Sequence, residues 1–447
     1  GVKEKNHKGL PWFGIPKLIP YLRGYGRLFL SMVLFGLLAS GMDVVIPLFQ
    51  QYAINHFIAD STMQGIWPFV ALYLLVMAVQ TASNYISAYG ACKAELYIGR
   101  DLRREAFDHV QTLSFSYFNQ NSVGYIHARV ISDTDRIAGT LAWGIMEGVW
   151  EIAYLLFAIV MMFALNWKLA LCVMVIVPIL VVSSIFFQKK LVFYHRKVRE
   201  HNSQITSAFN EGITGAKTTK TLVIEDKVEK EFDQLTGEMK RVSVRAMHFR
   251  SVFMSTTAFA ASIALAIVLW RGGIITREGV MLVGTLSVFM NYAQGMMEPI
   301  QWLVQVLSSL VNVQVNVERF TKLMETESDV RDTPEVTAKY GDAFHPKKEN
   351  WEPLHGDIEF RDVTFRYPDG EENILEHFNL KVPQGTNVAI VGETGAGKST
   401  LVNLVCRFFE PTEGQVLIDG RDARERSQLW LHSNIGYVLQ TPHLFSG

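Results

Sequence analysis

Long apolar runs, separated by polar segments, extend from Leu28 to Val311. A transmembrane helix needs about 20 mostly apolar residues to cross roughly 30 Å of hydrocarbon. Six runs have a suitable length: Leu28–Phe49, Ile66–Ala88, Ile137–Leu165, Leu169–Phe187, Val252–Trp270 and Val280–Val311. Buried helices of a large soluble protein are the alternative, but Leu169–Phe187 carries no charge and is longer than a core helix usually needs to be. The pattern therefore predicts six transmembrane helices.

The distribution of lysine and arginine predicts which side of the membrane each loop occupies. Only Asn166–Lys168 separates the third and fourth runs, so a tight hairpin is expected there. Two much longer segments, 89–136 and 188–251, together carry 19 lysines and arginines, whereas the opposite loops carry only Lys168, Arg271 and Arg277. Because cytoplasmic loops are enriched in these residues, we expect both long segments and both chain termini to be cytoplasmic.

The two long segments have the pattern of helices rather than of loops. Ala94–Leu113 and Lys189–Arg250 keep apolar residues at helical spacing and contain no proline. Long helices are therefore expected to continue beyond the bilayer, and turn residues in Phe118–Gly124 and Glu211–Gly215 would let short crosswise helices lie at their ends. Before the first run, Lys17–Arg27 mixes basic and apolar residues, as an interfacial helix does.

The composition favours a membrane protein and argues against some other classes. Charged residues make up 19% of the chain, against about 25% in ordinary soluble domains, and hydrophobic residues make up 49%. A net charge of −1 provides no basic field, so no nucleic-acid partner is expected. Cys92, Cys172 and Cys406 are too widely spaced for a metal site or a disulfide framework, and we expect them to be reduced.

The amino-acid composition of the chain changes at Thr326. Residues 326–355 are polar and interrupted by prolines, as in a linker. From residue 356 onward, Ile358–Tyr367 alternates like a half-buried strand. Further elements are expected at Leu380–Val382, Asn387–Val391 and Val416–Ile418 for strands, and at Ser399–Phe409 for a helix.

A glycine-rich turn between Asn387–Val391 and that helix matches the phosphate-loop pattern GxxxxGK(S/T). Its glycines let backbone N–H groups point at phosphates, at the positive end of the helix. Lys398 would add a charge between the phosphates, and the Ser399 hydroxyl could ligate Mg²⁺. We therefore expect ATP and Mg²⁺ as cofactors, bound by Gly392, Glu393, Thr394, Gly395, Ala396, Gly397, Lys398, Ser399 and Thr400.

The predicted fold class is a polytopic α-helical membrane domain followed by a partial α/β P-loop NTPase domain with an antiparallel β subdomain. The membrane domain is expected at residues 1–325, with an N-terminal interfacial helix and two cytoplasmic coupling segments. The linker is expected at 326–355 and the NTPase domain at 356–447.

Six apolar runs followed by this loop resemble the half-transporters of the ATP-binding cassette (ABC) exporter family, over nearly the whole chain. The phosphate loop alone fits many NTPases, whereas the ordered set of motifs is more specific. The further motifs are Tyr117–Asn119, Gly124, Arg129, Asp133–Arg136, Asn210–Gly212, Gly215, Lys220, Phe365–Pro368, Pro411–Gly414 and Gly436–Gln440.

The resemblance implies roles for individual residues. Tyr367 looks like the aromatic residue that stacks on adenine, and Gln440 like the glutamine that joins Ser399 in binding Mg²⁺. An ordinary strand-end tyrosine and a solvated glutamine are the alternatives. Coupling helices that dock on the cassettes are implied near Phe118–Thr134 and near Asn202–Thr219, the second of them on the partner subunit's cassette.

The resemblance also implies a dimer and a location. The partner is a second half-transporter, identical or different, and the dimer lies in the lipid bilayer of a bacterial-type plasma membrane with its nucleotide-binding domains in the cytoplasm. ATP would be held between the two cassettes.

The sequence departs from the family after Gln440. The family's signature loop, its acidic strand end with a catalytic glutamate and its switch histidine do not occur there. We therefore expect the chain to be truncated, or to be the ordered part of a longer protein. It carries no catalytic residue of its own, and we expect it to bind nucleotide weakly without hydrolysing it.

For the intact protein, the resemblance implies ATP-driven export of a small amphiphilic molecule, such as a drug, a lipid or a peptide. Alternatives are a nucleotide-gated channel or regulatory half with a degenerate ATPase site, and an importer with exporter-like helices. Four acidic residues at membrane depth, Asp43, Glu147, Glu151 and Glu298, are a clue to the cargo, because such groups usually face a cavity or a partner.

Glu147 and Glu151 are spaced i, i+4 and share one helix face, which would suit cationic amphiphiles. The alternative is that they lie at the interface or pair with a neighbouring helix. Met290–Glu298 would suit a permissive cavity, although such a stretch is more often a helix interface.

Overall fold

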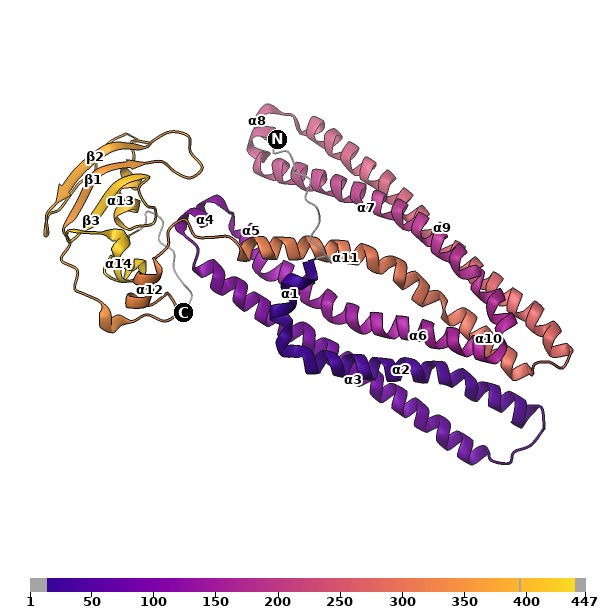
Figure 1. Ribbon diagram of the computed structural model, residues 1–447. Helices are drawn as coiled ribbons and strands as arrows, with labels where there is room; N and C mark the ends of the chain where they lie inside the picture. The colour runs from indigo at the N-terminus through magenta and orange to yellow at the C-terminus, as the bar shows by residue number, and fades with distance from the viewer. Residues whose placement is uncertain (1–13, 394, 439–447) are drawn as a thin grey trace. The chain divides into compact units, whose positions relative to one another are not determined.

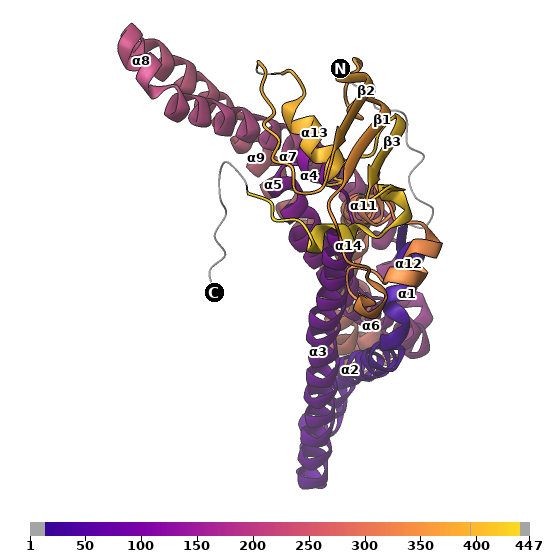
Figure 2. The same cartoon turned by 90° about the vertical axis from the view of Figure 1, so that its left-hand side faces the viewer.

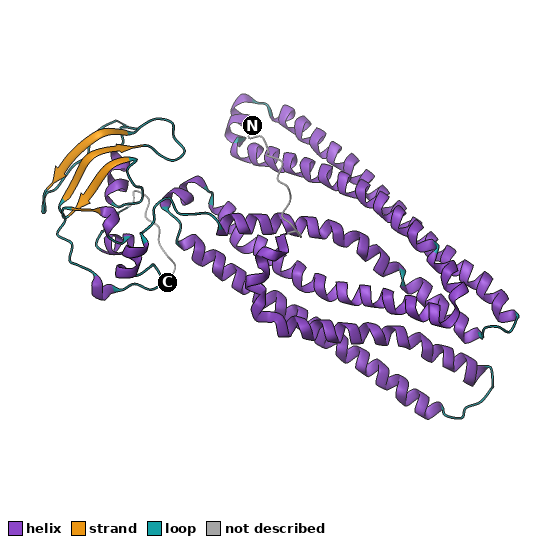
Figure 3. Cartoon of the chain, viewed as in Figure 1, coloured by secondary structure: helices purple, strands orange, loops and turns teal. Residues whose placement is uncertain are grey.

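The computed structural model describes residues 14–393 and 395–438. Within them, the contacts divide the chain into two units. We call residues 14–99 and 135–317 the helical unit, and residues 100–134 and 318–438 the mixed unit. Figure 1 and Figure 3 show helices and loops in the first unit, and a sheet with helices in the second.

The helical unit is made of long helices joined by short connections. Its helices are α1 (Ile15–Leu22), α2 (Gly26–Tyr52), α3 (Ile66–Gln111), α6 (Thr134–Met174), α7 (Ile176–Thr214), α8 (Ala216–Leu222), α9 (Glu225–Arg277), α10 (Val283–Gly295) and α11 (Met297–Met324). Both α3 and α11 continue into the mixed unit. In the described part of the chain, five helical stretches are long and apolar enough to cross a membrane. This agrees with the predicted multi-pass helices, which extend well beyond the apolar runs.

The third and fourth apolar runs meet at Asn166, where the sequence predicts a hairpin. Asn166 is the residue inside α6 whose backbone leaves helical geometry, with φ −160° and ψ 100°. Its side-chain oxygen accepts a hydrogen bond from the backbone N–H of Leu169 at 3.1 Å, and so caps the helix that follows. A short polar side chain at this position therefore ends one apolar helix and starts the next.

The sixth apolar run differs from the expected single span. It is divided between α10 and α11, with Met296 between them. Pro299 explains the break, because proline has no N–H to donate and its ring clashes with the carbonyl four residues earlier, which is that of Gly295. The apolar pattern of Val280–Val311 does not register this local effect.

Small residues and a few polar contacts hold the helical unit together. Ala158, Ala170, Ala264 and Ala293 are fully buried in one of its apolar clusters. Between helices in lipid there is little hydrophobic driving force, so small residues that allow close backbone approach stabilise the packing. Tyr292 adds a buried hydrogen bond from its hydroxyl to the backbone carbonyl oxygen of Val44, at 2.6 Å.

The second long segment between apolar runs, residues 188–251, forms a helical hairpin. Figures 1 and 2 show α7 and α9 side by side, with the short helix α8 at their ends. The crosswise helix expected near Asn202–Thr219 lies slightly later in the chain, because Asn202–Thr214 continues α7. The turn falls at Gly215, whose N–H donates to the carbonyl of Glu211 at 2.7 Å, and a Cβ there would lie only 2.8 Å from that oxygen. Glycine therefore fixes where α7 stops.

The mixed unit contains an antiparallel sheet, as predicted. Its strand order is β2 (Leu375–Val382), β1 (Ile358–Phe365), β3 (Glu413–Ile418) and β4 (Arg421–Asp422). In β1, Phe360, Val363 and Phe365 are buried and form an apolar core with α13 (Lys398–Val405). The expected strands at Leu380–Val382 and Val416–Ile418 are the ends of longer ones, β2 and β3.

The strand expected at Asn387–Val391 does not form. This segment has no regular secondary structure, and the side chains of Val388 and Val391 are 50% and 88% exposed. Within the described residues, no strand lies beside it to accept its backbone hydrogen bonds, and unpaired backbone does not hold a strand. Its apolar composition alone was therefore misleading.

The segment expected as a linker is folded onto the sheet. Residues 334–340 form α12 (Pro334–Tyr340), which begins with Thr333 accepting a hydrogen bond from the N–H of Val336 at 3.3 Å. Val336 and Tyr340 pack with Ile418 of β3 and with Trp430 of α14 (Gln428–Ser433). Proline at the first helical position favours a helix start here, which the linker reading did not anticipate.

Most of the first long segment, residues 100–134, also belongs to the mixed unit. After α3 the chain forms two short helices, α4 (Phe115–Gln120) and α5 (Val123–His127), followed by a π-helical turn, Ala128–Asp133. Helix α5 lies within the predicted range Phe118–Thr134, whereas α4 begins three residues before that range.

Candidate functional site

The phosphate loop adopts the strained turn that its glycines permit. Gly395 and Gly397 have φ values of +92° and +83°, a region that side chains with a Cβ rarely adopt. Gly397 is the N-cap of α13, and a Cβ on it would lie 3.1 Å from Cγ2 of Ile374. The loop therefore passes directly into a helix N-terminus, as the sequence predicted.

The side chain of Lys398 folds back into this loop. Its Nζ donates to the carbonyl oxygens of Gly392 at 2.8 Å and Glu393 at 2.6 Å. The ammonium group thus lies in the loop that leads into α13, and the first turn of that helix carries the positive end of the helix dipole. This arrangement gathers positive charge where phosphate oxygens would bind.

The two residues that follow Lys398 differ in their exposure to solvent. Ser399 is exposed on the first turn of α13, whereas Thr400 is 4% exposed. An accessible hydroxyl oxygen is a ligand that Mg²⁺ accepts alongside phosphate oxygens. The loop therefore fits a nucleotide with its metal ion, although Mg²⁺ binding itself stays a prediction.

Tyr367 lies beside the same helix turn. Its hydroxyl is 3.0 Å from Oγ1 of Thr400, and its half-buried ring packs edge-on against Phe365 and Phe409, with centroids 4.9 and 5.1 Å away. The structure thus brings Tyr367 next to the phosphate loop from a distant part of the sequence. Stacking on adenine stays a prediction.

Most of the predicted nucleotide-site residues fall within the described chain, and two do not. Thr394 and Gln440 lie outside the described residues. The others lie in or beside the phosphate loop: Tyr367, Gly392, Glu393, Gly395, Ala396, Gly397, Lys398, Ser399 and Thr400.

An aromatic contact that the sequence did not predict lies close by. Phe115 of α4 stacks on Phe408, just after α13, with centroids 5.0 Å apart and planes 16° apart. Phe409, the next residue, also touches the ring of Tyr367. The segment that contains α4 is thereby in contact with the residues that follow the phosphate-loop helix. The motif Tyr117–Asn119 pointed to this segment, but no pattern in the sequence pairs Phe115 with Phe408.

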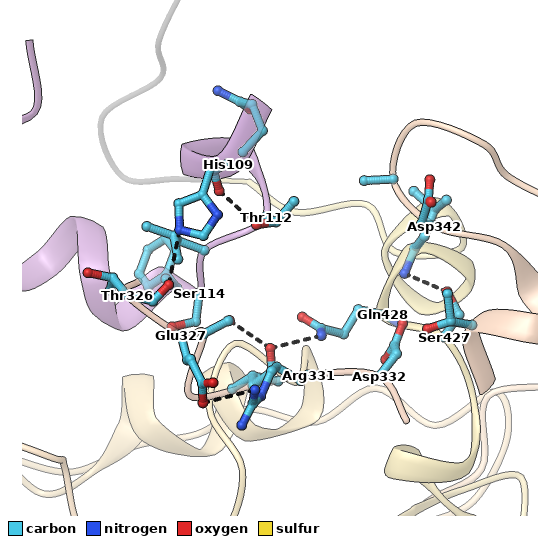
Figure 4. A pocket seen from close by; sticks show the side chains of 18 of the residues that line it. His109, Thr112, Ser114, Thr326, Glu327, Arg331, Asp332, Asp342, Ser427 and Gln428 are labelled. Carbon is cyan, nitrogen blue, oxygen red and sulfur yellow. Dashed lines mark hydrogen bonds and ion pairs between the residues drawn. The ribbon is translucent and has the colours of Figure 1, made fainter. Parts of the chain in front are cut away.

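A cavity of about 900 Å³ lies next to this contact, within the mixed unit. Figure 4 shows that its lining comes from the end of α3, from the segment that follows α11, and from α14. His109 places Nε2 3.0 Å from the carbonyl oxygen of Thr326, and Glu327 forms an ion pair with Arg331 at 3.0 Å. Gln428 donates to the carbonyl of Val330 at 3.3 Å. The cavity walls are thus tied to one another by polar contacts.

Comparison with known proteins agrees with this arrangement. Residues 28–300 match the family described as the ABC transporter transmembrane region, and residues 375–447 match the family described as ABC transporter. The first match alone covers more than half of the chain.

Individual relatives are similar over most of this chain. A probable multidrug resistance ABC transporter ATP-binding/permease protein, YheH of Bacillus subtilis, is 30% identical over 86% of this chain and 55% of its own length. The ATP-dependent lipid A-core flippase of Escherichia coli is 27% identical over 85% of this chain and 63% of its own. An uncharacterized ABC transporter ATP-binding protein, YfiC of B. subtilis, is 26% identical over 100% of this chain and 71% of its own. The chain spans between about half and three quarters of the length of these relatives.

The helices, the antiparallel sheet, the phosphate loop and these matches lead to one conclusion. The chain belongs to the ABC transporter family, as a transporter of the exporter type with an ABC membrane domain followed by part of an ABC ATPase domain.

Proposed function

We propose that the intact protein is one half of a dimeric, ATP-driven exporter of small amphiphilic molecules. The observation that carries this proposal is the phosphate loop, in which Lys398 lies inside a glycine turn at the start of α13. The same chain contributes at least five helical stretches suited to a membrane. A nucleotide site and a membrane pathway in one chain are what such coupling requires.

The chain's own residues would bind and orient the nucleotide. Lys398 would exchange the carbonyl oxygens of Gly392 and Glu393 for phosphate oxygens, and the N–H groups of α13 would donate to the same phosphates. Tyr367 would carry the base and Ser399 would ligate Mg²⁺, with Thr394 and Gln440 completing the site. Bound ATP would supply the free energy that favours one conformation of the dimer over another.

The first cytoplasmic segment is the proposed route from the nucleotide to the helices. Phe115 touches Phe408, and Phe408 lies three residues after the end of α13, so movement at the phosphate loop has a short packed path to α4. We propose that α8 makes the corresponding contact with the partner half. The proposed domain limits are 1–325, 326–355 and 356–447, with both termini and the ATPase part in the cytoplasm of a bacterial-type plasma membrane.

The cargo class is supported by two arguments. Relatives carry names that refer to multidrug resistance and to a lipid A-core flippase, and drugs and lipids are among the amphiphilic cargo proposed for this protein. The helical unit also contains a cavity with polar and aromatic lining, described below, which suits a molecule with an apolar body and a polar group.

The test is ATP hydrolysis by the full-length protein in lipid nanodiscs, measured with and without Mg²⁺. We expect turnover that is lost in Lys398→Ala and kept in Lys381→Ala, which removes an exposed lysine of β2 outside the loop. ATP binding without turnover would instead favour a nucleotide-gated or regulatory half, or one that needs a different partner chain. ATP-dependent accumulation of cargo on the cassette side of oriented vesicles would refute export.

A further inference from the structure

A cavity of about 490 Å³ lies among the helices of the helical unit. Residues of α2, α3, α6 and the α10–α11 junction line it. Asp43 comes from α2, Gln80 from α3, Trp150, Glu151 and Tyr154 from α6, and Glu298 from α11. Its size is within the range of pockets that hold drug-sized molecules.

The charged residues that line this cavity are all acidic. It includes four carboxylate residues, Asp43, Glu147, Glu151 and Glu298, and no lysine, arginine or histidine among the described residues that form it. Ionisable groups at membrane depth are costly, and they persist where they face a cavity or bind a partner. The cavity therefore has an excess of negative charge that its own walls do not balance.

Two of these carboxylates are fixed by neutral donors. Asp43 accepts hydrogen bonds from Nε2 of Gln80 and from Nε1 of Trp150, both at 2.9 Å. Glu147 accepts one from Nε1 of Trp302 at 3.3 Å. Amide and indole groups orient a carboxylate but bring no positive charge, so these contacts position the acids without neutralising them.

Glu151 is different, because it is buried and incompletely paired. It is 7% exposed, and its Oε2 has no hydrogen-bond partner in the part of the chain that the structure describes. A buried acceptor without a donor destabilises a fold, and more so when it is charged. Glu151 shares its helix face with Glu147 and lines the cavity, so a ligand there could supply the missing partner.

The geometry favours an organic cation over a metal ion. No group of three or more acidic, histidine or cysteine side chains in the described residues converges closely enough to hold a metal ion. Instead, Trp150 and Tyr154 stack along the wall, with ring centroids 5.8 Å apart and planes 19° apart. Aromatic faces beside carboxylates are the lining that a delocalised or alkylated cation prefers.

We propose that this cavity binds a hydrophobic organic cation, whose positive charge is accepted by the carboxylate of Glu151 while Trp150 and Tyr154 contact its apolar body. This inference rests on the proposed export function, since it names the cargo class. Asp43, Glu147 and Glu298 add to the negative potential, and the Met146 side chain provides an adaptable apolar contact.

The test measures binding without ATP, so its outcome is independent of transport. The full-length protein in nanodiscs is titrated with tetraphenylphosphonium and with tetraphenylborate, two ions of similar size and opposite charge. We expect the cation to bind more tightly than the anion. In Glu151→Gln, we expect at least tenfold weaker binding of the cation and no loss for the anion, and Glu151→Asp should retain much of the preference.

The matched control is Glu95→Gln. Glu95 also accepts a hydrogen bond from a tryptophan, Trp143 at 2.8 Å, but it does not line the cavity. The cation affinity of Glu95→Gln should equal that of the wild type.

If Glu151→Gln fails to fold, Glu298→Gln at an exposed part of the lining replaces it, with a smaller expected loss of at least threefold. Equal affinity for both ions, or unchanged cation affinity in every carboxylate variant of the cavity, would overturn the proposal. Transport that fails while this binding holds would count against the export function alone.

Discussion

The guanidinium of Arg407 donates to the carboxylate of Asp332 at 2.7 Å, although 75 positions separate the two residues in sequence. Arg407 is 2% exposed and lies just after α13, while Asp332 lies in the segment that precedes α12. The same guanidinium donates to Glu410 at 2.9 Å and to the carbonyl oxygens of Arg331 and Arg426 at 3.1 and 2.8 Å. One buried side chain thus ties the chain that leaves the helices to the ATPase part.

Replacing Arg407 with alanine should destabilise the mixed unit strongly. The change would leave Asp332 and Glu410 without their cation, and breaking such a buried pair typically costs about 3–5 kcal/mol. We expect a markedly lower midpoint of thermal unfolding and faster proteolysis before α12. Arg361→Ala is the control, because its pair with Glu359 is at the surface and should contribute less than about 1 kcal/mol. Equal effects of the two variants would contradict the role given to Arg407.

The stack between Phe115 and Phe408 should appear as an energetic coupling. Aromatic pairs of this kind contribute about 0.5–1.5 kcal/mol beyond the area they bury. A double-mutant cycle of Phe115→Ala and Phe408→Ala, measured by thermal unfolding, should therefore be non-additive by that amount. Phe118→Ala is a matched control, since Phe118 is 42% exposed and Phe115 is 41% exposed on the same helix. Strict additivity of the first pair would show that the stack carries no coupling.

Substitutions of Tyr367 should distinguish the contributions of its ring and of its hydroxyl to ATP affinity. Tyr367→Phe removes the contact with Thr400 but keeps the ring, so ATP affinity should fall by less than about tenfold, as for one neutral hydrogen bond. Tyr367→Ala removes the surface proposed to carry adenine, and its loss should be larger for ATP than for inorganic triphosphate. The measurement is equilibrium binding of both ligands. Equal losses for the two ligands would argue against adenine stacking.

The edge of the sheet should respond to pH through His377. A hydrogen bond to the Asp362 carboxylate, at 2.9 Å, and its negative charge raise the pKa of His377 above its ordinary value of 6.5. A raised pKa means that this pair stabilises the fold fully below the unfolded-state pKa and loses that contribution as pH rises through the folded-state pKa. Backbone amides where β2 pairs with β1 should therefore be more strongly protected from hydrogen exchange at pH 5.5 than at pH 8, after each rate is corrected for the intrinsic rate at that pH.

Asp362→Asn tests this explanation directly. The amide keeps the size of the side chain but removes the charge, so an NMR titration should show the pKa of His377 returning toward 6.5. A pKa that stays raised in this variant would assign the shift to other groups.

The sequence alone determined the features that depend on local composition. Apolar length identified the membrane helices, because crossing hydrocarbon requires a minimum run of apolar residues whatever their neighbours are. Glycines and Lys398 identified the phosphate loop, since positive φ angles and a helix N-terminus are local requirements. Asn166 likewise marked a break between two helices.

Only the tertiary structure decided which distant residues meet. Asn387–Val391 has the composition of a strand but no neighbour to pair with in the described chain, and residues 334–340 have the composition of a linker but fold onto β3. The partners of Arg407, Phe115 and Glu151 have no sequence signature either. Packing and hydrogen bonding between remote segments depend on three-dimensional proximity, so a pattern read along one dimension cannot specify them.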